Sequence, residues 1–295
     1  MKKLILSSIT IILFSSSVFA QDISPYIKVG ETTNTMQQTS EAVINALKNN
    51  SFTILGKYNP ENKNTFQVIV FTNKNLKNTV VKVSDRGALG AAFKVGLIEK
   101  NGKITISYTN PDYFLRAYMQ DNYVTFKSVF QKFSADVKNA LATLGNEFKP
   151  FGGSIEANKI KKYHYKVFMP YFTDPVELNE FASFDIGLKT IENNLKAHKG
   201  KTILVYKIIY PEQKVAVFGI GLQNKEDGEA YFLPKIGEQN IAAMPYEIIL
   251  QGKTVTMLHG KYRLALSWPE LTMGTFMKIM STPGDIEDTL KAVCE

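Results

Sequence analysis

The stretch KVGLIEKNGKITISY (residues 94–108) decides the fold, because it predicts a β-hairpin. Asn101-Gly102 suits a two-residue type I′ turn, in which both residues take a positive φ. Residues on either side of this turn read as strands. The chain is therefore expected to contain antiparallel sheet rather than the parallel sheet of α/β folds.

Working outward from the hairpin, a helix pattern precedes it and another follows it. Upstream, Met36, Ser40, Val43 and Leu47 are spaced by 4, 3 and 4 residues, which places them on one helix face. Downstream, the apolar stripe of residues 126–144 predicts a second helix, with Gly145 as its C-cap.

The same order of elements recurs in the second half. Phe184, Leu188, Ile191 and Leu195 repeat the 4, 3, 4 spacing, and a Thr-Ile-Leu strand start follows each first helix, at residues 53 and 202. Residues 282–295 form a shorter counterpart of the last helix. The repetition predicts an internal duplication, with a first copy at 21–148, a linker at 149–158 and a second copy at 159–295.

Residues 102–119 and 260–277 resemble each other at an offset of 158. They share Gly, Lys, Pro and Met at four matching positions. The second half is predicted to run as strands over residues 247–267, with turns at Gln251-Gly252 and His259-Gly260, and to carry additional strand. The expected class is α+β: two tandem related domains, each an antiparallel sheet with helices on one face, in a monomer with an internal pseudo-twofold.

The first twenty residues predict a cleaved signal peptide. Lys2 and Lys3 are followed by a short apolar run and by small residues ending at Ala20, the expected cleavage position. No later segment has the length of a membrane-spanning helix. The mature chain is therefore predicted to be a soluble periplasmic protein.

Charge and cysteine content exclude some functions. The net charge of +8 is spread along the chain, and its densest cluster, at residues 158–166, also alternates like a strand. We interpret that cluster as a solvated strand face, with a patch for nucleic acid or anionic lipid as the less favoured alternative. Cys294 is the single cysteine, so no internal disulfide forms.

No catalytic or metal-binding signature stands out. His164, His198 and His259 lie apart, without the spacing of a zinc or copper site, and no nucleophile elbow is present. We therefore predict no metal, no cofactor and no nucleic-acid partner.

The turn SYTNPDYF (residues 107–114) is the best candidate site. Tyr108, Asn110 and Asp112 supply a phenol, an amide and a carboxylate beside a proline, a set that can orient a small polar ligand. Turn formation and backbone capping by Asn and Asp explain the same residues. Asn73, which ends another strand, and Trp268, at the matching site of the second copy, are candidates with the same alternative of a purely structural role.

Part of the chain resembles the bacterial domain-of-unknown-function 302 family. The resemblance covers residues 25–145 and is carried by Phe71, Thr72, Asn73, Lys94, Val95, Gly102, Tyr108, Asn110, Pro111 and Tyr113. The second copy is more remote, since Asn110-Pro111-Asp112 becomes Trp268-Pro269-Glu270. The resemblance implies a small α+β fold similar to the TATA-binding-protein topology of strand, helix, four strands and helix, and it implies no established activity.

The predicted function is an exported, non-catalytic binding protein. Its ligand is expected to be a small molecule or a periplasmic protein, held between the copies or behind the turn at 107–114. Two alternatives stay open: an enzyme with acid–base residues at that turn, Asp112 and Tyr108, and a structural protein of the cell envelope.

Overall fold

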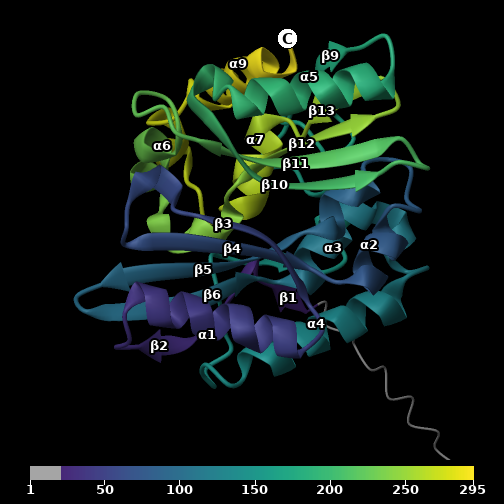
Figure 1. Cartoon of the computed structure of the whole chain (residues 1–295). Coiled ribbons are helices and arrows are strands. Elements are labelled where there is room, and N and C mark those ends of the chain that lie inside the picture. Colours follow the sequence, from purple (N-terminus) through teal and green to yellow (C-terminus); the bar gives the residue numbers. More distant parts are fainter. Residues whose placement is uncertain (1–20) are drawn as a thin grey trace, which may run out of the picture.

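The computed structural model describes residues 21–295, so the predicted signal peptide and its cleavage position at Ala20 lie outside the described residues. Two antiparallel sheets lie in the middle of the molecule, with their main helices on the outer sides (Figure 1). This arrangement confirms the predicted α+β class. Within the described residues, no helix is both long and apolar enough to cross a membrane.

The first sheet has the strand order β3-β4-β5-β6-β2-β7. Asn101 and Gly102 adopt φ values of 53° and 72°, and Lys100 pairs with Lys103 across this turn, which confirms the predicted hairpin. The strands are β2 (Tyr26–Thr32), β3 (Thr53–Tyr58), β4 (Phe66–Thr72), β5 (Phe93–Lys100), β6 (Lys103–Thr109) and β7 (Lys149–Phe151).

Two long helices cover the outer face of the first sheet. Helix α1 (Met36–Asn49) begins with a capping box between Thr35 and Gln38, and helix α4 (Lys127–Leu141) packs beside it. Their apolar stripes are buried, and Phe133 of α4 contacts the rings of Phe52, Phe71 and Phe93. Two shorter helices, α2 (Lys74–Val80) and α3 (Pro111–Met119), complete this half.

The second sheet has the order β10-β11-β12-β13-β9. Its strands are β9 (Val176–Glu180), β10 (Thr202–Tyr210), β11 (Val215–Leu222), β12 (Tyr246–Gln251) and β13 (Thr254–Met257). Helices α5 (Phe184–Lys196) and α9 (Thr282–Cys294) cover its outer face, and α6 (Glu229–Ile236), α7 (Gly260–Ser267) and α8 (Met273–Met277) complete the half. When the strands of each half are counted in chain order, this order is the same as β3-β4-β5-β6-β2 in the first sheet. A common origin of the halves by duplication stays a prediction.

The expectation for residues 260–267 is wrong, because they form helix α7 and not a strand. The hairpin of the second half turns at Gly252, with φ of 59°, and β13 ends at Met257. His259 then accepts a hydrogen bond from the Lys261 N–H at the start of α7. The offset of 158 therefore aligned a strand with a helix, and the second sheet gains no additional strand within the described residues.

The segment predicted as a linker contains β7, which pairs with β2, and β8 (Ile155–Glu156), which pairs with β1 (Asp22–Ile23), and its role as a linker stays a prediction. The expectation for the basic cluster that follows it is wrong. The basic cluster at 158–166 forms a 3₁₀ turn, η4 (Ile160–Lys162), and not a strand. Ile160 is fully buried and holds this turn against the core, which overrides the alternation of the sequence.

The two halves are in contact because each half packs a short segment against the sheet of the other half. Segment η2 (Gly87–Ala91) of the first half packs on β11 and β12, and η6 (Glu238–Ala243) of the second half packs on β5. Strands β3 and β10 run close together at Gly56, where a Cβ atom would lie 2.0 Å from the Val205 carbonyl oxygen. The inner faces are therefore covered by mutual packing.

Candidate functional site

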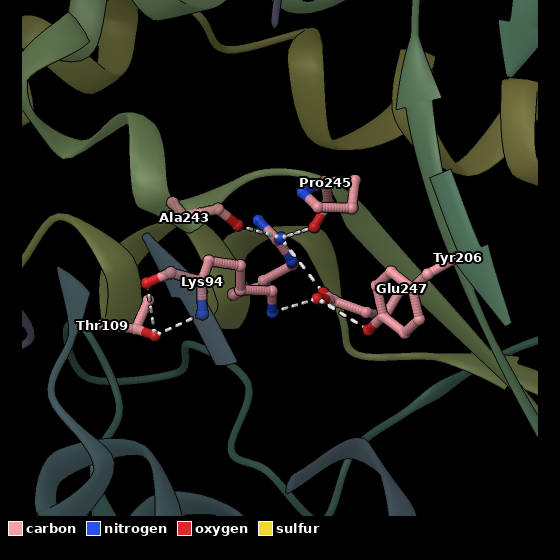
Figure 2. A network of polar contacts seen from close by, with 7 residues as sticks. Lys94, Thr109, Tyr206, Ala243, Pro245 and Glu247 are labelled. Carbon is pink, nitrogen blue, oxygen red and sulfur yellow. Dashed lines mark hydrogen bonds and ion pairs between the residues drawn. The ribbon is translucent and has the colours of Figure 1, made fainter. Parts of the chain in front are cut away.

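Three charged side chains are buried together between the halves (Figure 2). Lys94 is 7% exposed, Glu247 7% and Arg263 3%. The Lys94 ammonium donates to Glu247 Oε1, and Arg263 Nη2 lies 3.2 Å from Glu247 Oε2. We call these three residues the charged cluster.

The two central strands position the ion pair. Lys94 is the second residue of β5 and Glu247 the second residue of β12, and these strands hold the same place in their sheets. The backbone of Lys94 is fixed because its N–H donates to Thr109 Oγ1 at 3.0 Å and its carbonyl accepts from the same hydroxyl at 3.3 Å. The pair therefore joins β5 and β12, one strand from each sheet.

Arg263 reaches the pair from helix α7. Its Nη2 donates to the carbonyl oxygens of Ala243 and Pro245, both at 2.7 Å, and its guanidinium lies 3.6 Å from the centre of the Tyr246 ring. Its Nε and Nη1 have no hydrogen-bond partner within residues 21–295. Buried donors without partners are uncommon and costly, which suggests that another group completes this site.

A small cavity adjoins Arg263. Its volume is about 10 Å³, and it is lined by the charged cluster together with Thr109, Ser267, Ala92, Phe93, Phe114, Tyr118, Ala242 and Ala243. A volume of this size holds one group the size of a water molecule. The lining combines apolar walls with several polar groups.

The charged cluster carries an excess of positive charge. Burial lowers the pKa of Lys94, against the opposing effect of Glu247. Burial acts in the same direction on Arg263, but the Glu247 carboxylate beside it raises the pKa of Arg263 above its usual range. Two basic side chains thus share one carboxylate.

Most residues predicted for the site have other roles in the structure. Asn73 accepts a hydrogen bond from the Leu76 N–H at 2.8 Å and caps α2, and Asn110 caps α3 through the Asp112 N–H at 3.2 Å. The side chain of Asn110 also donates to the Ser24 carbonyl at 2.8 Å. Asn73 additionally lines a surface hollow of about 300 Å³ beside α4.

The predicted acid–base pair is not brought together around a ligand position. Asp112 forms an ion pair with Arg116 at 3.1 Å and accepts from the Tyr123 hydroxyl. Tyr108 is buried in β6 opposite Val95, and burial raises the pKa of its phenol to about 12. From the turn at 107–114, Thr109 and Phe114 line the cavity between the halves.

Trp268 is buried at the end of α7, where its indole N–H donates to the Gly237 carbonyl at 3.0 Å. It follows Ser267, which lines the cavity. Among the described residues, no group of three or more His, Cys, Asp or Glu side chains is arranged to hold a metal ion.

Sequence reasoning overlooked Glu247 and Arg263 and treated Lys94 only as part of a family motif. A signal was present, since each charged residue interrupts an apolar run: FKVGLI, YEIIL and YRLAL. A charge in a run predicted to be buried on both faces requires a buried partner.

A second buried carboxylate, Glu229, also joins the halves. It accepts hydrogen bonds from Tyr58 Oη at 3.0 Å, the Glu61 N–H at 3.2 Å and the Leu222 N–H at 3.1 Å. Burial outweighs these donors and raises the pKa of Glu229 to about 7. In the folded chain, the Glu229 carboxyl therefore stays protonated to a higher pH than an ordinary glutamate does.

This pKa predicts a loss of stability as the pH rises. Because the pKa of Glu229 is higher in the folded than in the unfolded chain, its contribution is complete below the unfolded pKa and disappears as the pH rises through about 7. Between about pH 5 and pH 8, the unfolding free energy of the wild type should fall by about 2–3 kcal/mol more than that of E229Q. Urea denaturation at both pH values measures this difference. The exposed E41Q is the control, and an unchanged slope in E229Q would contradict the assignment.

Comparison with known proteins supports the family resemblance for the first half. Residues 29–144 match the family model described as "Domain of unknown function DUF302". The crystal structure of an uncharacterized conserved DUF302 protein from Bacillus stearothermophilus is similar, with 14% identity, a TM-score of 0.31, and coverage of 40% of this chain and 93% of that chain. No curated protein matches the chain. Lys94 lies inside the matched range, whereas Glu247 and Arg263 lie outside it.

Proposed function

We propose that this chain is an exported periplasmic binding protein that holds a small monovalent anion at the charged cluster. Export is supported by the layout of residues 1–20. The binding position is supported by the cavity between the halves, since ligand sites occur preferentially at interfaces between domains.

One observation carries the proposal: the buried guanidinium of Arg263 has two donors without partners within residues 21–295, and Arg263 lines the cavity together with Lys94. An anion there accepts from Nε and Nη1 of Arg263 and balances the second cation. Charge-assisted hydrogen bonds of this kind are about twice as strong as those between neutral groups. A water molecule satisfies the donors but leaves the positive charge unbalanced.

The size of the cavity limits the ligand. A volume of about 10 Å³ accepts a halide ion, or one carboxylate oxygen of a small acid, only with a slight displacement of the lining. The lining residues Ala242 and Ala243 belong to η6, which rests on β5. Displacement of η6 from β5 would therefore admit the ligand.

The proposal is tested by thermal unfolding in sodium chloride, formate, acetate and sulfate at constant ionic strength. A bound monovalent anion should raise Tm by about 5 °C at a hundredfold excess over its Kd. R263K keeps the charge but removes the fork of donors, so the shift should disappear, while R116K on the surface of α3 should keep it. If no anion changes Tm more than the ionic-strength control does, the proposed function is wrong.

A further inference from the structure

Residues 159–172 form a loop that is anchored at both ends. Ile160 is fully buried, and the hydroxyls of Tyr163 and Tyr165 donate to the carbonyls of Ala265 at 3.2 Å and Leu271 at 2.6 Å. At the other end, Phe172 is 2% exposed, with the Arg86 guanidinium 4.5 Å from the centre of its ring. These anchors hold the residues between them in a defined position.

The tip of this loop presents two apolar side chains to solvent. Val167 is 72% exposed and Phe168 101% exposed. Phe168 also has a φ of 65°, in the left-handed region that a bulky residue rarely adopts. Such strain persists where the surrounding structure imposes it, and it is concentrated at functional segments. An anchored loop with a strained, exposed aromatic tip is typical of a binding element.

The loop that carries the tip is basic. Residues 158–171 contain four lysines and no acidic residue. Lys159 and Lys161 are paired with Glu156 and Asp121, whereas Lys162 and Lys166 form no ion pair within residues 21–295. Two lysines without ion pairs within these residues therefore belong to the loop that carries the apolar tip.

Additional apolar surface lies next to the loop. A hollow of about 470 Å³ is lined by Tyr165 and Lys166 of the loop and by Met273 at the start of α8. Met273 and Met277 are exposed one helical turn apart. The apolar surface thus extends beyond the two residues of the tip.

We infer that residues 162–168 dock on an anionic lipid surface, with Phe168 and Val167 entering the interfacial region and Lys162 and Lys166 meeting the headgroups. An aromatic tip flanked by lysines matches the two contributions to interfacial binding, apolar burial and attraction to anionic lipid. The complete exposure of Phe168 indicates a projecting tip, whereas a protein partner is more often received in a pocket or groove. This inference is independent of the anion proposed for the charged cluster.

The test is sedimentation of the full chain with phosphatidylcholine vesicles, with and without phosphatidylglycerol. Binding is expected only to the anionic vesicles and should weaken as salt increases. F168A should reduce the partition coefficient about tenfold, and K162Q and K166Q about fivefold each. F168W should keep binding, because Trp favours the interface.

Matched variants separate this effect from a general loss of apolar surface or charge. I186A and K196Q remove an exposed apolar residue and an exposed lysine from α5, away from the loop, and should bind as the wild type does. Circular dichroism of F168A should match the wild type, since Phe168 contacts solvent. Equal binding by F168A and the wild type, or capture of a protein by Phe168 without binding to vesicles, would overturn the inference.

Discussion

Replacement of Glu247 with leucine should lower the free energy of unfolding by about 4 kcal/mol. The reason is electrostatic: E247L removes the single carboxylate that balances Lys94 and Arg263, and both cations are buried. Removing one partner of a buried ion pair costs more than the pair itself contributes, because the remaining charge stays out of water. Urea denaturation followed by far-UV circular dichroism measures the loss.

The control for this prediction is a variant of Lys94, the cationic partner of Glu247 in the same ion pair. K94M leaves Arg263 and Glu247 as a one-to-one pair, so we expect a cost of only about 1 kcal/mol. The cluster therefore predicts a strong asymmetry between two variants of the same ion pair. Equal losses from E247L and K94M would show that positive charge is not in excess at this site.

The second large effect is expected from G56A. The added Cβ would lie 2.0 Å from the Val205 carbonyl oxygen, and neither backbone can turn away as a flexible side chain would. The substitution forces β3 and β10 apart, with an expected cost of about 3 kcal/mol. Trp268 is the single tryptophan and is buried in the second half, so its fluorescence reports whether the second half is disturbed too.

G284A is the matched control for G56A. A Cβ at Gly284 meets nothing within 4 Å, and the residue lies in helix α9, where alanine is the better helix former. We expect G284A to be neutral or to stabilise the chain slightly. Equal stability of G56A and the wild type would mean that the halves approach less closely at this point.

Local patterns predicted much of the fold. Asn101-Gly102 specified its own turn, and the stripes at 36–47 and 184–195 identified helices, because turn geometry and helix periodicity depend on neighbours within a few residues. The prediction was wrong at 260–267. Four residues identical to the first-half hairpin indicated a strand there, although the hairpin of the second half already turns at Gly252.

The site was less predictable because its members are distant in sequence. Lys94 and Glu247 are separated by 153 residues, and no local pattern reports which charge will be the partner of another. Asn73 and Asn110 attracted attention as polar residues at element ends, yet their side chains mainly cap the helices that follow them. Interrupted apolar runs were the better indicator of the site.

The packing of η2 on β11 and β12, and of η6 on β5, limits the order in which the chain can fold as it emerges from its N-terminus. When the chain has emerged as far as Phe151, the first sheet is complete in sequence, but the segment that covers β5 has not yet emerged. Until residues 238–263 emerge, the Lys94 ammonium must stay hydrated and the neighbouring apolar surface uncovered. During this interval the first sheet exposes apolar surface that the second half later covers. The risk of aggregation therefore depends on how long the rest of the chain takes to emerge.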